Sequence, residues 1–334
     1  MSTSVETTKE SRTVSFAEAI RSALRDAMRE DERVFLIGED IGAPGGVFNV
    51  TQGLFAEFGA ERVRDTAIAE QGITAAAVGA AIGGMRPVLE IMFNDFMALA
   101  LDQLANEAAK LHYMTGGQLK VPLTVRTAYG PASSGAGHHS QTLYAWFCHV
   151  PGLKVVVPSN PVDAYGLLRA SIDYDGPVVF FEDKQLYQQT TTEPLSGKAD
   201  RLGVAKVGRV GADVTVVAIG RYVPVALALA AELAPDIDVE VIDARTLFPL
   251  DEETIISSAR KTRRVIVIES GVRRFGVSSE IATRIYEGAF DYLDAPVERL
   301  AAREVVIPFS PALEAAVLPT KDDLERAVLG LRKG

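Results

Sequence analysis

Short apolar segments of strand length alternate with helical segments along most of this chain. The predicted buried strands span residues 34–38, 63–68, 87–92, 121–126, 153–158 and 178–182, then 214–219, 239–242, 265–268 and 297–300. Apolar residues recur at helical spacing between them, over 16–29, 73–83, 97–114, 161–172, 223–233, 251–260 and 277–286. Because strands that alternate with helices form mostly parallel sheets covered on both faces, the pattern predicts an α/β protein.

A polar, threonine-rich stretch over residues 188–203 interrupts this alternation. A chain of 334 residues is long enough for two domains with separate cores. We therefore predict an N-terminal domain over 13–187 with a doubly wound parallel sheet, a linker over 188–203, and a smaller C-terminal α/β sandwich over 204–334. Residues 1–12 are polar and are predicted to be a disordered tail.

Composition excludes several classes of function. A net charge of −10 without any basic run argues against a nucleic-acid surface. The longest apolar runs have strand length, which predicts no membrane span, and the polar N-terminus lacks a secretory signal, so a cytoplasmic location is expected. Cys148 is the only cysteine, and the adjacent His138 and His139 do not match metal-ligand spacing, so no metal site is predicted in this chain.

The stretch Asp65-Thr66-Ala67-Ile68-Ala69-Glu70-Gln71-Gly72 joins a predicted strand to a helix built mostly of alanine and glycine. Glu70 stands where open parallel sheets place ligand-binding groups, which makes it a candidate functional residue. The alternative is structural, because an acidic side chain at a helix start is favoured by the helix macrodipole. The glycines at 79, 83 and 84 predict that another helix backbone approaches this helix closely.

Two further segments carry candidate site residues. Gly135 and Gly137 make the loop that ends in His138-His139 flexible, and a histidine presented to a cleft by such a loop can transfer protons near neutral pH. The alternative is a surface loop with solvated imidazoles. In Phe93-Asn94-Asp95-Phe96, which follows a strand, the aromatic rings can stack on a flat ligand or belong to the core, and Asp95 is expected to be exposed or a helix cap.

Many stretches of the chain, taken together, resemble the β subunit of the thiamine diphosphate-dependent component of 2-oxo acid dehydrogenase complexes. That family includes the pyruvate, branched-chain 2-oxo acid and acetoin dehydrogenases, and the similarity extends from about residue 15 to 331. The matching stretches are Gly46-Val47-Phe48, Asp65-Thr66-Ala67-Ile68-Ala69-Glu70, Arg86-Pro87-Val88-Leu89-Glu90, Asp102-Gln103, His139-Ser140-Gln141, Ala145-Trp146-Phe147, Pro151-Gly152-Leu153-Lys154-Val155-Val156 and Pro158-Ser159.

The resemblance implies roles for five residues. Glu70 matches the glutamate that hydrogen-bonds the aminopyrimidine ring of thiamine diphosphate and favours the tautomer that activates the cofactor. Phe96 matches an aromatic residue that stacks on the pyrimidine, with Met92 nearby. His139 matches a histidine implicated in proton transfer or in reductive acylation of the lipoyl group. His138 departs from the Gln or Tyr that is commoner there, which leaves the division of roles between the two imidazoles open.

The family motif that holds the diphosphate and Mg²⁺, Gly-Asp-Gly followed by an Asn, does not occur in this sequence. The resemblance therefore implies an α subunit that carries this end of the cofactor, with two α and two β chains sharing interfacial sites. It also implies that the C-terminal domain serves β–β contact and docking on the lipoyl acyltransferase core. Tyr174 stands where relatives with a monovalent cation often have Asp, which argues against that ion here.

Three functional hypotheses follow. The first is the β subunit of a pyruvate dehydrogenase type enzyme, which decarboxylates a 2-oxo acid on thiamine diphosphate and transfers the acyl unit to lipoamide. The second keeps the enzyme class but makes the substrate acetoin or a branched-chain 2-oxo acid. The third, from another class, is a non-catalytic scaffold subunit that only organises partners.

Overall fold

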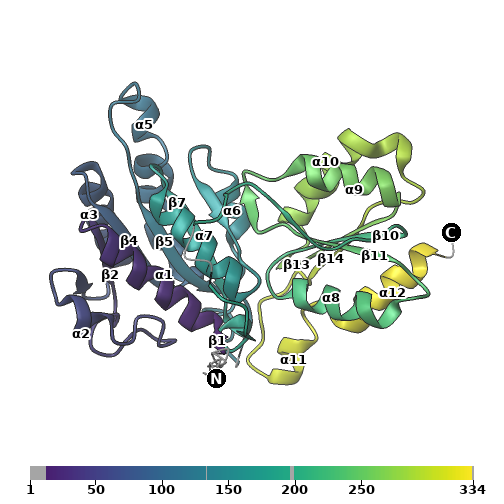
Figure 1. Ribbon diagram of the computed structural model, residues 1–334, viewed down its shortest axis with the longest axis horizontal. Helices are drawn as coiled ribbons and strands as arrows, with labels where there is room; N and C mark the ends of the chain where they lie inside the picture. The colour runs from purple at the N-terminus through teal and green to yellow at the C-terminus, as the bar shows by residue number, and fades with distance from the viewer. Residues whose placement is uncertain (1–12, 133, 196–198, 333–334) are drawn as a thin grey trace, which may run out of the picture.

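The computed structural model describes residues 13–132, 134–195 and 199–332. The predicted disordered tail, residues 1–12, lies outside the described residues. The chain forms two α/β lobes that lie side by side, the N-terminal lobe at the left of Figure 1 and the C-terminal lobe at the right. The prediction of an α/β protein with two sheets is confirmed.

The N-terminal lobe is built on a seven-stranded sheet with the order β12-β6-β7-β5-β4-β2-β3. Neighbouring strands are parallel except β12, which pairs antiparallel with β6. The strands are β2 (Val34–Gly38), β3 (Val63–Asp65), β4 (Arg86–Phe93), β5 (Thr124–Tyr129), β6 (Lys154–Val156), β7 (Val178–Asp183) and β12 (Thr246–Phe248). The last of these comes from the C-terminal half of the sequence.

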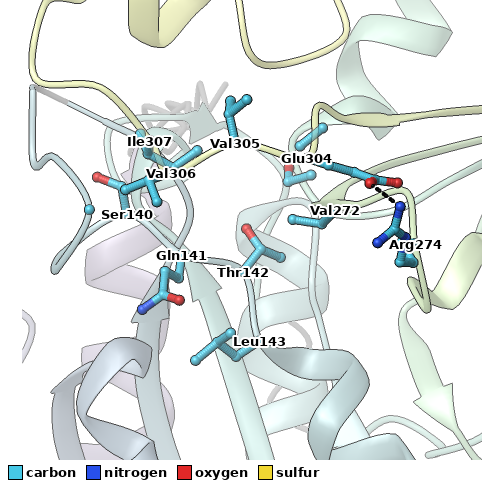
Figure 2. A pocket seen from close by; sticks show the side chains of 13 residues that line it. Ser140, Gln141, Thr142, Leu143, Val272, Arg274, Glu304, Val305, Val306 and Ile307 are labelled. Carbon is cyan, nitrogen blue, oxygen red and sulfur yellow. Dashed lines mark ion pairs between the residues drawn. The ribbon is translucent and has the colours of Figure 1, made fainter.

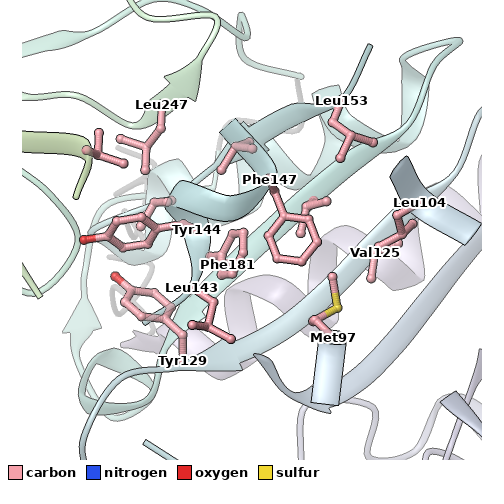
Figure 3. Close-up of a cluster of buried hydrophobic side chains, with 14 of the residues drawn as sticks. Met97, Leu104, Val125, Tyr129, Leu143, Tyr144, Phe147, Leu153, Phe181 and Leu247 are labelled. Carbon is pink, nitrogen blue, oxygen red and sulfur yellow. The ribbon is translucent and has the colours of Figure 1, made fainter. Parts of the chain in front are cut away.

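Helices cover both faces of this sheet. On one face α1 (Phe16–Glu30) packs on α7 (Pro161–Asp173), and α1 begins with a capping box between Ser15 and Glu18. On the other face lie α3 (Glu70–Ile82) and α4 (Met97–Asp102), with the aromatic core of Figure 3 between the sheet and α6 (Tyr144–Cys148). In that core the ring centroids of Tyr144 and Phe181 are 6.0 Å apart, edge to face.

The C-terminal lobe is a sandwich around a five-stranded sheet with the order β14-β13-β10-β11-β9, in which only β9 is antiparallel to its neighbour. Its helices α8 and α12 lie on one face and α9 and α10 on the other (Figure 1). The elements are β9 (Lys206–Arg209), β10 (Val214–Ala218), β11 (Val239–Asp243), β13 (Val265–Val272), β14 (Glu298–Ala302), α8 (Tyr222–Leu233), α9 (Glu252–Thr262), α10 (Val277–Ala289) and α12 (Lys321–Arg332).

Shorter elements complete the fold. They are β1 (Val14–Ser15), β8 (Thr190–Thr191), α2 (Leu54–Phe58), α5 (Leu111–Met114), α11 (Pro311–Ala315), a π-helical turn η2 (Gln103–Ala108), and the 3-10 turns η1 (Asn94–Phe96), η3 (Lys184–Leu186) and η4 (Phe290–Tyr292). The segment predicted as one helix over 97–114 is therefore three successive helical segments. No helix in the described part of the chain is long and apolar enough to cross a bilayer.

Several predicted strands have different bounds in the structure, and two of these differences have a local cause. The strand expected over 63–68 ends at Asp65, whose carboxylate accepts a 2.8 Å hydrogen bond from the Gly42 backbone, and Ile68 is 81% exposed. The strand expected over 121–126 is β5, which begins three residues later, after Pro122. Proline has no amide proton for a sheet ladder, so the sequence before Thr124 cannot extend the strand regularly.

Buried polar pairs join the two lobes. The Arg221 guanidinium, from the start of α8, donates to both carboxylate oxygens of Asp183 at the end of β7, with distances of 2.7 and 2.5 Å. The Tyr144 hydroxyl donates to Glu269 Oε2 at 2.7 Å, across the junction between α6 and β13. Together with the pairing of β12 on β6, these contacts hold the lobes in one arrangement.

Candidate active site

Two buried carboxylates lie at neighbouring strand ends of the N-terminal sheet. Glu39 directly follows β2 and is 9% exposed, and Glu70 is the first residue of α3 after β3 and is 8% exposed. Because β2 and β3 are adjacent and parallel, their carboxyl ends meet at one edge of the sheet. Burial, and secondly the charge of Glu70, raise the pKa of the Glu39 carboxyl.

The Glu70 carboxylate is left free to accept hydrogen bonds. Within residues 13–132, 134–195 and 199–332, no group donates a hydrogen bond to this carboxylate, although the Thr74 hydroxyl donates to the Glu70 backbone oxygen at 2.6 Å. Its neighbour Glu39 accepts from the Ala69 backbone, while Glu39 Oε1 has no partner among the described residues. Buried carboxylates are normally paired, so this pair is a site where a ligand could supply the missing donors.

A cluster of three rings lies at the same edge of the sheet. The His139 ring centroid is 4.7 Å from that of Phe93 and 5.5 Å from that of Phe96, with interplanar angles of 90° and 87°. Strand β4, which ends at Phe93, is the neighbour of β2 on the side opposite β3, with Glu90 paired to Gly38. The rings and the two carboxylates therefore share the carboxyl edge of three adjacent strands.

The two histidines differ in their surroundings. His138 is exposed, whereas His139 is half-buried and packs between Phe93 and Phe96. Met92, the residue before Phe93 in β4, is also half-buried. Of the five residues singled out in the sequence, the structure brings Phe96 and His139 into contact and places Met92 and Glu70 on the same edge of the sheet, with His138 turned to solvent.

Asn94 and Asp95 hold the loop that carries His139. The expectation that Asp95 is exposed or a helix cap is wrong, because it is 9% exposed and its Oδ1 accepts from the backbone and the side chain of Gln141 at 3.2 and 3.0 Å. Asn94 donates to the Gln141 carbonyl at 3.0 Å and accepts from the Leu143 amide at 2.9 Å. A polar pair between two phenylalanines at a strand end was the signal for this role.

The loop that carries His139 also borders a cavity of about 480 Å³ between the two lobes. Figure 2 shows Thr142 and Leu143 on one side of it and Val305 on the other, with the 2.7 Å ion pair between Arg274 and Glu304 at one end. A Cβ added at Gly137 would lie 2.7 Å from a methyl group of Val306, so a larger residue there would require the Val306 side chain to move.

The glycine-rich face of α3 faces away from the rest of the described chain. Gln71, Gly72, Ala75, Ala76 and Gly79 are exposed, and no atom in the described residues lies within 4 Å of a Cβ built at Gly79. Helix α3 packs instead through its other face, with Ile73, Ala77 and Ala81 buried. The predicted close approach of another helix to the glycines is therefore not made within the part of the chain that the structure describes.

Comparison with known protein families matches both lobes. The model of the transketolase pyrimidine-binding domain matches residues 12–190, and that of the transketolase C-terminal domain matches residues 203–324. A pyrimidine-binding domain of this kind implies that the chain binds thiamine diphosphate.

Three relatives match almost the whole chain. The acetoin:2,6-dichlorophenolindophenol oxidoreductase subunit beta of Bacillus subtilis is 46% identical over 96% of this chain and 97% of its own length. The pyruvate dehydrogenase E1 component subunit beta of Rhizobium meliloti is 44% identical over 95% of this chain and 69% of its own length. The 2-oxoisovalerate dehydrogenase subunit beta of Bacillus subtilis is 41% identical over 94% of this chain and 97% of its own length.

A solved structure described as a split-gene transketolase in an inactive beta4 tetramer superposes with a TM-score of 0.79 over 96% of this chain and 98% of that chain. At 23% identity this likeness shows the fold alone. The family matches and the three relatives go further: the chain belongs to the transketolase-like family of β subunits of the 2-oxo acid and acetoin dehydrogenases.

Proposed function

We propose that this chain is the β subunit of a heteromeric, thiamine diphosphate-dependent dehydrogenase of the pyruvate dehydrogenase type. The enzyme decarboxylates a 2-oxo acid oxidatively and transfers the acyl unit to lipoamide. The observation that carries the proposal is the buried Glu70 carboxylate, which receives no hydrogen bond within the described chain and lies on the same sheet edge as Phe96 and His139.

The residues at this edge fit the pyrimidine end of thiamine diphosphate. An aminopyrimidine has a flat face and ring nitrogens that need hydrogen-bond partners. Glu70 offers a carboxylate without a partner to the nitrogens, and Phe96 offers an aromatic ring to the flat face. Met92 would add an adaptable apolar wall. We assign Glu70, Met92 and Phe96 to cofactor binding and Glu70, His139 and His138 to catalysis.

When bound, thiamine diphosphate supplies the nucleophilic carbon that adds to the carbonyl carbon of the substrate. This chain's part is to bind, orient and move protons. Glu70 lies buried at a helix N-terminus, where its carboxylate would meet the pyrimidine ring through a hydrogen bond and orient it. The imidazole of His139 can exchange protons with a substrate oxygen, with its ring plane fixed by Phe93 and Phe96.

The site needs an α subunit. The diphosphate motif absent from this sequence would be carried by that partner, and Mg²⁺ would be held mainly there. In the described residues, no group of three or more His, Cys, Asp or Glu side chains could hold a metal ion. We propose two α and two β chains, β–β contact, and docking on a lipoyl acyltransferase core. The domain division at 13–187, 188–203 and 204–334 and the cytoplasmic location stay predictions.

The test is reconstitution with an α subunit of a dehydrogenase of this family. We expect the purified chain alone to be inactive, the α/β pair to oxidise pyruvate with thiamine diphosphate and Mg²⁺, and Glu70→Gln to abolish that activity. Full activity from the isolated chain would defeat the shared site. If the pair bound no thiamine diphosphate in a titration, the non-catalytic scaffold would be the correct hypothesis.

Acetoin is the second candidate substrate. It is favoured by the Bacillus subtilis relative whose name states acetoin, which is 46% identical over nearly the full length of both chains. The same reconstituted pair can be assayed with 2,6-dichlorophenolindophenol as electron acceptor. The kcat/KM values for acetoin, pyruvate and 2-oxoisovalerate then show which candidate substrate is preferred. A preference for 2-oxoisovalerate would instead support the branched-chain alternative, for which a relative is 41% identical.

A further inference from the structure

Lys184 stands at the end of a strand next to the histidine loop. It is the first residue of the η3 turn that follows β7, and its ammonium group donates a hydrogen bond to the backbone carbonyl of His139. Among the described residues, this ammonium is the only hydrogen-bond donor to the backbone of His139. The Asn94–Asp95 pair holds the loop at residues 141 and 143 only.

The same ammonium also contacts the ring that orients His139. Lys184 Nζ lies over the Phe93 ring, 5.4 Å from its centroid, and the His139 ring meets Phe93 edge to face at 4.7 Å. A cation is attracted to the face of an aromatic ring, and perpendicular ring pairs are favoured over stacked sandwiches. One side chain thus fixes both the backbone and, through Phe93, the ring plane of His139.

Holding the Lys184 ammonium in this position is energetically unfavourable for the lysine itself. Burial lowers the pKa of the Lys184 ammonium, while Asp95, Asp183 and Glu314 oppose that change and Arg221 adds to it. A lysine side chain also loses rotamer entropy when it is fixed. A solvated lysine would avoid both penalties, so its fixed position calls for an explanation beyond filling space.

We propose that Lys184 is a positioning residue that holds His139 in its reactive orientation. The inference rests on the proposed function, because Lys184 has no chemical role of its own and acts only through the imidazole of His139. It also explains how a histidine on a loop with glycines at 135 and 137 keeps a defined orientation, since this loop would otherwise sample several conformations.

The test is a double-mutant cycle on the α/β holoenzyme. Lys184→Met keeps the apolar stem and removes the ammonium, and it is expected to lower kcat by about 10- to 100-fold, because a misplaced catalytic group costs about this much. In a His139→Gln background the same change is expected to alter kcat by less than about twofold, because the two residues act as a unit. An equal loss in both backgrounds, as a merely structural role would give, overturns the proposal.

Lys154→Met is the matched control. Lys154 Nζ also lies over an aromatic ring, 4.7 Å from the centroid of Tyr174, and burial also lowers the pKa of its ammonium. It lies in β6, and its ammonium contacts Tyr174 rather than the histidine loop. We expect this variant to keep the kcat of the unmutated enzyme, so that any loss in Lys184→Met cannot be assigned to removal of a lysine from an aromatic face in general.

A structural readout separates this inference from the proposed function. In the full chain, magnetisation transfer between the His139 and Phe93 ring protons is expected to disappear in Lys184→Met and to persist in Lys154→Met. If the α/β pair turns over no candidate substrate, the proposed function fails while this readout still decides on Lys184. Persistence of the ring contact without the ammonium overturns the inference, and Lys184→Gln replaces Lys184→Met should the latter not fold.

Discussion

The buried carboxylates of this chain fall into two groups that differ in what surrounds them. At the junction between the lobes, Asp183 receives two hydrogen bonds from Arg221, and Glu269 receives one from Tyr144 and one from the Ser278 amide at 2.6 Å. At the edge of the N-terminal sheet, Glu70 receives none and Glu39 keeps one oxygen without a partner, within the described chain.

This difference separates two uses of a buried charge. A carboxylate that is completely paired within its own chain holds segments together, and removing its partner costs stability. A carboxylate left without donors costs stability in the folded chain and is retained where a ligand completes it. The contrast predicts that the two groups respond in opposite ways to substitution.

The largest effect is expected from Glu70→Gln, which removes the acceptor charge and leaves the folded chain intact. Activity of the α/β pair should fall by about 10²- to 10⁴-fold, the usual contribution of a group that transfers protons. The measurement is kcat with thiamine diphosphate at saturation. Glu61→Gln is the control, because Glu61 lies at an exposed position before β3 with its side chain 93% accessible. Equal activity of both variants would remove the distinction between the two groups.

Arg221→Met should act on stability instead. It leaves Asp183 completely buried without its partner, which is expected to lower the free energy of unfolding by about 3–5 kcal/mol. Urea denaturation of the full chain measures the change. Arg284→Met, which removes an exposed arginine paired with Glu280 and Glu287, is expected to leave the midpoint of urea denaturation almost unchanged. A similar loss in both variants would contradict the role of the junction.

The junction should also make stability depend on pH, through Asp243 at the end of β11, which accepts a hydrogen bond from the Ser159 hydroxyl of the N-terminal lobe. Burial raises the pKa of Asp243 to about 7, well above the value of an unfolded aspartate. Between about pH 4 and pH 7 the folded chain therefore holds a proton that the unfolded chain releases, so this group's contribution to stability falls as pH rises, by up to about 1.4 kcal/mol per pH unit. The slope of unfolding free energy against pH should become less negative in Asp243→Asn. An unchanged slope would show that Asp243 is ionised throughout.

The smallest effect, and of opposite sign to Arg221→Met, is expected from Glu39→Gln. The change replaces a carboxylate whose pKa burial raises by a neutral amide, and should increase the free energy of unfolding by about 1 kcal/mol at pH 8. The gain should shrink at pH 4, where the original side chain is largely protonated in the folded chain. Loss of stability at pH 8 would place Glu39 among the paired carboxylates.

Local patterns were sufficient to predict most of the fold. The Ser15–Glu18 capping box and the apolar spacing after it define α1, and the alternation of elements gives both sheets. What could not be predicted depends on distant partners. β12 is three residues long and pairs with a strand about ninety residues earlier, and no local periodicity marks it. The early end of β3 depends on a contact between Asp65 and Gly42 that the sequence does not indicate.

The site was predicted in part, for a related reason. Glu70, Phe96 and His139 stand in segments whose spacing and family resemblance single them out, and the structure brings the last two together. Glu39 and Lys184 were missed because each follows a strand in an otherwise ordinary sequence, and their roles arise only when the carboxyl ends of β2, β3, β4 and β7 meet. Position at the end of a parallel strand was the available signal for both.

Strand β12, which the C-terminal half of the sequence contributes to the N-terminal sheet, has a practical consequence for anyone who wishes to study the lobes separately. A fragment that ends at residue 203 would leave β6 as an exposed edge strand with unpaired backbone groups. Such an edge strand can pair with other chains and cause aggregation. Precipitation of the isolated N-terminal half would then result from the absence of β12 and would not show that the core of this lobe is unstable. A short peptide carrying residues 244–250, added in excess, should keep that half in solution.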